Sequence, residues 1–213
     1  MTTPDAPRPR GTYAKGIARR QEILDRAIEV FAQRGGQRTS LRAIAQEVGV
    51  THAALTHYFG SLDELLVAVY REAAARPGLK AAEPSAKAPD GGPAESDPPR
   101  SPAETMRVSA VENRAIPGLV QLYSTLVSSA LDGAHPAAQE FITDRFARLR
   151  DELTGQVRTL QASGALRADL DAALVAALVI AASDGLQTQW LLDAAVDHEA
   201  GLALLDRLLA PPA

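Results

Sequence analysis

The sequence predicts an all-α protein in which a proline-rich segment joins two helical regions. Apolar residues recur every three or four positions through most of the 213 residues, which is the spacing of helices with one buried face. No run of alternating β-branched and polar residues, the pattern of a half-buried strand, is present. Residues 77–102 hold seven of the fourteen prolines and a single large apolar residue, Leu79. They are therefore expected to form a mobile linker or a long loop.

Four helices are predicted before the proline-rich segment, at about residues 18–34, 40–49, 52–58 and 61–75. Each boundary carries a residue type that begins or ends helices. These residues are Gly35-Gly36, Thr39 and Ser40, Gly49, the cap Thr51, and the capping box of Ser61 and Glu64.

Five helices are predicted after the segment, at about residues 101–115, 117–132, 136–162, 170–194 and 197–209. The first begins with an N-cap serine, a proline and a glutamate, the second and third begin with prolines, and glycines follow the second and third. The third has its apolar residues on one face from Ile142 to Leu160.

One of these helices has no polar face over the eleven residues Ala172–Ala182. A helix that is apolar all round must be covered on every side, by its own domain or by a second subunit. We favour a second subunit, because the last helix, with Leu204 and Leu208 among its leucines, also offers more apolar surface than one neighbour needs.

Composition and charge narrow the function classes. The chain has no cysteine, which excludes disulfide scaffolds, thiolate metal sites and thiol catalysis. The start of the chain has no signal-peptide core, and its longest apolar run is well short of the roughly 20 residues that span a bilayer. A soluble cytoplasmic protein without a membrane partner is expected. The net charge of -4 is unevenly distributed along the chain. Residues 1–76 have 11 Lys+Arg and 8 Asp+Glu, whereas residues 77–213 have 11 Lys+Arg and 18 Asp+Glu. The basic front suits an anionic ligand at one end.

The helices at about residues 40–49 and 52–58 have the spacing of a helix-turn-helix. Gly49 lies at the turn, and Ala45 supplies a small residue where the helices cross. Pattern alone leaves open a DNA-binding unit or an ordinary three-helix packing unit. The predicted outer face of the second helix consists of Thr51, His52, Ala53, Thr56 and His57.

Several spaced motifs lie between residues 17 and 70. They are Ile23-Leu24-Asp25-Arg26-Ala27, Phe31 and Gly35, Thr39-Ser40-Leu41-Arg42-Ala43-Ile44-Ala45, Gly49-Val50-Thr51, Tyr58-Phe59 and Leu65-Leu66. Together they resemble the N-terminal domain of the tetracycline-repressor (TetR) family. The resemblance implies a helix-turn-helix DNA-binding domain over residues 17–76, with its motif at about 40–59, and a larger helical domain over residues 103–213 for ligand sensing and dimerisation.

The resemblance further implies a transcriptional regulator, a repressor released by a small-molecule effector, that binds a palindromic operator as a homodimer through its last two helices, at about 170–209. Direct contact with base edges is expected from Thr51, His52 and Ala53, and with phosphate from Thr56 and His57. The preceding helix holds the backbone through Ser40 and Arg42. The full set expected at the DNA is Thr39, Ser40, Arg42, Thr51, His52, Ala53, Thr56, His57 and Tyr58.

Two positions depart from the family pattern. Many members have Tyr at the position of Thr56 and Lys at that of Leu62, and both usually touch phosphate. A flexible basic arm over residues 1–16, with Arg8, Arg10 and Lys15, would compensate in the minor groove, or touches nothing.

Candidate ligand-binding residues come from the larger side chains of the second region, although an ordinary core stripe is the better account of any single one of them. They are Met106, Asn113, Tyr123, Leu126, Phe141, Ile142, Phe146 and Trp190. Tyr123 and Trp190 are the best candidates because each has a polar tip. No basic residue is among them, which favours a neutral or lipophilic ligand. Asp184 is either a hydrogen-bonding group at the dimer interface or an acid in the pocket.

The alternative from another functional class is an enzyme, but the sequence shows no candidate active site. The four histidines, which include His135 and His198, have no partners at metal-ligand spacing, and no catalytic or nucleotide-binding fingerprint is present. No catalytic residue, metal or cofactor is expected. The alternative within DNA-binding proteins is a constitutive or protein-controlled regulator without a ligand.

Overall fold

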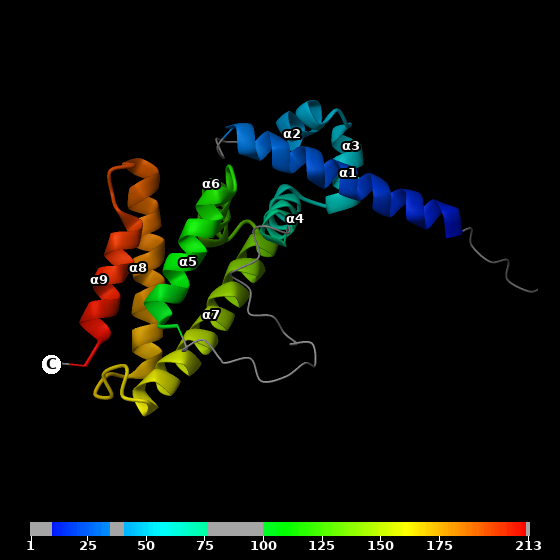
Figure 1. Ribbon diagram of the computed structural model, residues 1–213. Helices are drawn as coiled ribbons and strands as arrows, with labels where there is room; N and C mark the ends of the chain where they lie inside the picture. Colours follow the sequence, from blue (N-terminus) through cyan, green and yellow to red (C-terminus); the bar gives the residue numbers. More distant parts are fainter. Residues whose placement is uncertain (1–9, 35–40, 76–99, 212–213) are drawn as a thin grey trace, which may run out of the picture.

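The computed structural model describes residues 10–34, 41–75 and 100–211 (Figure 1). The described residues form helices only, as the sequence predicts. These are α1 (Arg10–Arg34), α2 (Leu41–Val48), α3 (His52–Phe59), α4 (Leu62–Ala75), α5 (Pro102–Ala115), α6 (Leu119–Asp132), α7 (Pro136–Ala162), α8 (Ala172–Leu192) and α9 (His198–Leu209).

The helices are arranged from one end of the molecule to the other. The small helices α2 and α3 lie against α1 at one end, α4 leads from them towards α6 and α7, and α8 and α9 lie at the opposite edge (Figure 1). The long helix α7 runs from the α4 side to the far end, so it contacts α4, α6 and α8. The part that carries the helix-turn-helix is therefore remote from the last two helices.

Buried apolar side chains form two clusters, and their border does not follow the linker. The first cluster joins α1–α4 to α6 and the start of α7, and Tyr70 of α4 packs with Tyr123 and Phe141 within it. The second joins α5, the end of α7, α8 and α9 around Leu153, Val179 and Leu202. The domain boundary predicted near residue 76 is thus a boundary along the sequence. In three dimensions, α4 shares its apolar core with α6 and α7.

Local capping fixes most of the helix ends. Ser101 Oγ accepts from Glu104 N at 3.0 Å at the start of α5, and Ser61 Oγ accepts from Glu64 N at 3.2 Å at the start of α4. The predicted start of a helix at Pro117 is two residues early. Gly118 has φ +78°, a left-handed conformation that is incompatible with the first turn of a helix, so α6 begins at Leu119.

The largest difference from the predicted helices is at the start of α1. The helix begins at Arg10 rather than near residue 18, so residues 10–16 of the predicted flexible arm are helical. Gly11 and Gly16 lower helix propensity by only about 1 kcal/mol each relative to Ala, which the rest of a 25-residue helix offsets. Arg8, Thr39 and Ser40 lie outside the described residues, as do residues 77–99 of the proline-rich segment.

The helix predicted to be apolar all round has two different faces. Val175, Val179 and Ile180 of α8 are buried, whereas Leu174 and Leu178 are each 65% exposed. In the described part of the chain, α8 is long and apolar enough to cross a membrane. This is weak evidence for a membrane span, because the core helix of a soluble protein satisfies the same test.

Helices α8 and α9 approach closely at Gly201. A Cβ atom at this position would lie 2.7 Å from Cδ1 of Leu186, well inside van der Waals contact. A side chain at Gly201 would therefore have to displace the end of the Leu186 side chain for α9 to keep its packing against α8.

Candidate nucleic-acid interface and internal cavity

Helix α3 is held as the second helix of a helix-turn-helix by its own caps. Thr51 Oγ1 accepts from Ala54 N at 3.1 Å, and Gly49 in the turn and Gly60 after the helix have φ of +74° and +71°. The side chains of Leu55 and Phe59 are buried under α3. This leaves the opposite face of α3 in solvent.

The structure brings the predicted DNA-contacting residues of α3 onto that face. Thr51, His52, Ala53, Thr56 and His57 are all exposed. The Thr56 hydroxyl donates to the carbonyl oxygen of His52 at 3.0 Å, so its donor is already used within the helix. The His57 imidazole has no such internal bond among the described residues, and it lies edge-on to Tyr58, which is half-buried.

Helix α1, at the same end of the molecule, carries exposed cations. Lys15, Arg19 and Arg20 are exposed, and the Arg20 guanidinium lies 4.8 Å from the centre of the Phe59 ring at the end of α3. Arg42 belongs to α2, but its side chain lies outside what the structure describes. The outer face of α3 therefore offers imidazole and hydroxyl groups, whereas Arg20 packs on the ring of the buried residue Phe59 and Arg19 pairs with Glu22.

A buried carboxylate connects the helix-turn-helix end to α7. Asp63, 5% exposed at the start of α4, accepts from Ala137 N at 3.0 Å in the first turn of α7. Burial alone would raise its pKa, but hydrogen bonds from the Ser61 side chain and from backbone amides of Ala137 and Ala138 outweigh that effect and lower it. Asp63 thus remains ionised at the positive end of α7.

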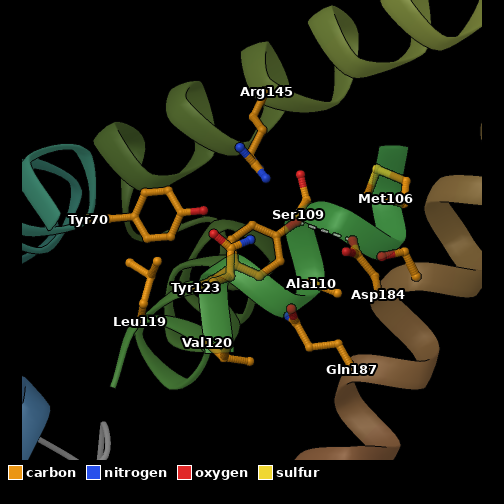
Figure 2. A pocket seen from close by; sticks show the side chains of 12 residues that line it. Tyr70, Met106, Ser109, Ala110, Leu119, Val120, Tyr123, Arg145, Asp184 and Gln187 are labelled. Carbon is orange, nitrogen blue, oxygen red and sulfur yellow. Dashed lines mark hydrogen bonds between the residues drawn. The ribbon is translucent and has the colours of Figure 1, made fainter. Parts of the chain in front are cut away.

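A small cavity lies on the border between the two apolar clusters. It has a volume of about 20 Å³, and its lining comes from α4, α5, α6, α7 and α8 (Figure 2). The lining residues are Tyr70, Met106, Ser109, Ala110, Asn113, Leu119, Val120, Tyr123, Arg145, Ser183, Asp184 and Gln187. This volume holds one water molecule, so a larger guest requires the surrounding helices or side chains to move.

Two of the polar side chains that line the cavity are hydrogen-bonded to each other, and a third has an unused donor. The Tyr123 hydroxyl donates to Asp184 Oδ2 at 3.2 Å. Burial is the main cause that raises the pKa of Tyr123, and burial also raises that of Asp184 against the opposing effects of Tyr123 and Arg145. Arg145 Nε is sealed from solvent and has no hydrogen-bond partner among the residues that the structure describes. An unpaired buried donor of this kind costs about 1–3 kcal/mol.

The eight predicted ligand residues divide between the cavity and its surroundings. Met106, Asn113 and Tyr123 line the cavity. The remaining five lie outside it: Leu126, Phe141 and Ile142 are core residues, Phe146 is partly buried, and the Trp190 ring lies under the Arg114 guanidinium. Asp184, for which the sequence left two roles open, lines the cavity.

Arg145 and Tyr70 are among the cavity residues that were not predicted from the sequence. The list of candidate ligand residues held no basic residue, whereas Arg145 lies in the wall of this cavity, which removes the basis for expecting a neutral or lipophilic ligand there. A signal was available, since Arg145 is three residues after Ile142 and four before Leu149, on the apolar stripe of α7. Tyr70 belongs to α4, and only the tertiary fold brings it here.

No group of three or more histidine, aspartate or glutamate side chains in the described part of the chain could hold a metal ion. Residues 23–69 match the family described as bacterial regulatory proteins, tetR family, and residues 126–211 match the C-terminal domain described as a BetI-type transcriptional repressor. The chain belongs to the TetR family. Membership of this family places it among transcriptional regulators and not among enzymes.

Similar proteins agree with this assignment of the TetR family. The chain is 41% identical over 73 residues to the HTH-type transcriptional regulator BetI of Brucella suis, covering 33% of this chain and 37% of BetI. It is 37% identical over 65 residues to the HTH-type transcriptional repressor AcnR of Corynebacterium efficiens, covering 30% and 35%. The match thus spans little more than a third of the length of these relatives.

Solved structures share the fold over nearly the whole chain. A putative TetR-family regulator from Rhodococcus sp. superposes with a TM-score of 0.64 at 20% identity, over 90% of this chain and 98% of that one. A putative transcriptional regulator from Saccharomonospora viridis, solved in complex with choline, has a TM-score of 0.62 at 19% identity, over 92% and 99%. At these identities the likeness concerns the fold alone.

Proposed function

We propose that the protein is a cytoplasmic repressor that binds a partly palindromic DNA operator as a homodimer and leaves it when a small molecule enters the internal cavity. The observation that carries the proposal is the exposed outer face of α3, on a helix-turn-helix within the segment that matches the TetR family. Residues 17–76 supply the DNA contacts, and residues 103–213 supply the ligand cavity and the dimer contacts.

The residues of the exposed α3 face have different proposed roles in DNA binding. His52 and Ala53 lie at the N-terminal end of α3, where a recognition helix meets base edges in the major groove, and Thr51 caps this end. His57 is the better phosphate donor, since the Thr56 hydroxyl already donates to the His52 carbonyl. The supporting contacts come from Thr39, Ser40, Arg42 and Tyr58.

Selection of bound duplexes from a random DNA pool tests this proposal. The expected result is an inverted repeat whose half-sites are about one helical turn apart, as two α3 helices of a dimer require. Substitution His52→Ala should lower discrimination among variants of that duplex, whereas Arg42→Ala should weaken all sequences and reduce the salt dependence. An enriched sequence without two-fold symmetry, or none at all, would contradict the proposed mode of binding.

A second copy of the chain is the proposed cover for the exposed face of α8 and α9. Leu174 and Leu178 of α8 and Leu204 and Leu208 of α9 are between 48% and 65% exposed. Contiguous apolar surface of this kind marks a contact site, and a C2 dimer buries the same patch on both subunits. Both helices lie at the edge remote from α1–α3, so this contact leaves the two α3 faces free for DNA (Figure 1).

Effector control is proposed through the cavity between the two apolar clusters. One cluster contains the helix-turn-helix and α4, and the other contains the proposed dimer helices. A ligand that separates them would change the spacing of the two α3 helices, provided it binds one arrangement more tightly than the other. Solved relatives with bound choline and with bound imidazole support a small-molecule site in this fold.

A constitutive regulator without a ligand is the second candidate, and the small volume of the cavity favours it. A thermal-shift screen of the free protein, followed by an operator-release assay of the complex, distinguishes the two with small organic anions, cations and neutral compounds. Compounds that raise the melting temperature of the free protein and release the operator support effector control. Compounds that do neither, alongside normal operator binding, favour the constitutive regulator.

A further inference from the structure

The cavity contains a cation that belongs to the protein. Arg145 reaches in from α7, and its guanidinium carbon lies 5.3 Å from the ring centre of Tyr123 and 5.9 Å from that of Tyr70 (Figure 2). Both distances fall within the range of cation–π contacts. The aromatic faces that would hold a quaternary ammonium ligand are therefore already occupied by the chain's own positive charge.

Burial lowers the pKa of Arg145, but Tyr70, the Tyr123 hydroxyl and the more distant Asp184 outweigh burial and raise it, so the charge is met by its neighbours in the cavity although its Nε–H is not used. No ion pair joins its guanidinium to a carboxylate within the described ranges, although Asp184 lies in the same lining. The nearest acid is instead bonded to the Tyr123 hydroxyl. The buried Nε–H also lacks an acceptor. A half-buried arginine whose sealed Nε–H is unused has the chemistry of an anion site.

Neighbouring polar groups can complete such a site. The Ser109 side chain on α5 points towards Arg145, and the amide of Gln187 reaches the cavity from α8 (Figure 2). A planar carboxylate matches the guanidinium fork, which donates two parallel hydrogen bonds, and a hydroxyl can donate a third. A cation in the same place would meet the positive charge of Arg145 at short range.

We propose that the effector is a small organic carboxylate bound by Arg145, and not a quaternary ammonium compound. The inference rests on the proposed function, since it names the ligand class of the same cavity. Binding would supply the missing acceptor for Arg145 Nε and would draw the guanidinium from its position over Tyr70 and Tyr123. Because Tyr70 lies on α4 and Arg145 on α7, this movement acts directly on the border between the two clusters.

The test is calorimetric titration of the full-length protein with acetate, hexanoate and benzoate, and separately with choline as the cation. At least one carboxylate should bind the native protein, and Arg145→Gln should weaken it about ten- to hundredfold, the effect of losing a charge-assisted hydrogen bond. The same variant frees two aromatic faces, so it should bind choline more tightly than the native protein does. This gain cannot be produced by misfolding. Arg148→Gln, an exposed arginine on the same helix, is the matched control and should change neither affinity.

The remaining outcomes overturn the inference. They are choline binding to the native protein, carboxylate binding that Arg145→Gln leaves unchanged, and failure of all three carboxylates to bind at millimolar concentration. Operator binding measured on the same sample separates these results from a failure of the proposed function. A protein that binds its operator and responds to choline keeps the function and loses the anion site, whereas one that binds no operator loses the function itself.

Discussion

Removal of the Asp63 carboxylate should destabilise the protein and loosen the junction between α4 and α7. Asp63→Ala deletes the acceptor for Ala137 N and leaves an amide of the first turn of α7 without a partner. Loss of a helix cap costs about 1 kcal/mol, and loss of a negative charge at a helix N-terminus costs up to about 1 kcal/mol more. A combined loss of about 2 kcal/mol lowers the melting temperature of a protein of this size by about 4–8 °C.

Calorimetry or circular dichroism melting at neutral pH measures this loss. The matched control is Glu140→Ala, because Glu140 is an exposed acid near the same end of α7 and, among the described residues, accepts no hydrogen bond from the first turn of that helix. The control should change the melting temperature by less than about 2 °C, since exposed substitutions cost little. If Asp63→Ala changed the melting temperature by as little as the control does, the role assigned to the buried carboxylate would be refuted.

The pH dependence provides an independent check of the same assignment. The folded pKa of Asp63 lies below its ordinary value of 3.8, so the stability it contributes is fully present above that value and is lost as pH falls through the folded pKa. The difference in melting temperature between the native protein and Asp63→Ala should therefore stay constant from neutral pH to about pH 5 and shrink below about pH 4. A difference that grows as pH falls would contradict the lowered pKa.

Three further predictions concern the helices at the opposite edge. Gly201→Ala should lose about 1 kcal/mol in denaturant unfolding, because its Cβ would lie 2.7 Å from the end of the Leu186 side chain, and Leu186→Ala should cost less in the Gly201→Ala variant than in the native protein; an unperturbed single variant would contradict the close packing. Leu178→Glu should convert the dimer into monomers in sedimentation velocity and weaken operator binding, and an unchanged dimer would place the subunit contact elsewhere. Burial, aided by Arg114, lowers the pKa of His198, whose ring nitrogens have no partner, so the native protein should lose stability as pH falls through about 6.5, whereas His198→Leu should not; equal pH slopes in both would be the negative result.

The parts of the fold that could be predicted are those that depend on neighbouring residues. The cap Thr51, the turn glycine Gly49 and the capping residue Ser101 act within three or four positions, and the structure has them where the sequence placed them. The outer face of α3 follows from helical spacing once Leu55 and Phe59 are recognised as the buried side. The exposed α3 residues could therefore be named without the fold.

The cavity could be predicted only in part, because it depends on contacts between distant segments. Tyr70, Tyr123, Arg145 and Asp184 come from four helices, and no local pattern indicates that they meet. A charged residue on an amphipathic helix ordinarily faces solvent, which is why Arg145 was overlooked among its apolar neighbours. The large aromatic residues that seemed suited to a ligand, such as Phe141, instead fill the core beside Tyr70.

The central claim is that the exposed face of α3 recognises a particular DNA sequence. Fluorescence anisotropy titration of the selected duplex, beside a scrambled duplex of the same length and composition at physiological salt, tests it most directly. The selected duplex should bind at least about 10³-fold more tightly, with two protein chains on each duplex. Equal affinity for the two duplexes would contradict the claim and reduce DNA binding to non-specific attraction of phosphate.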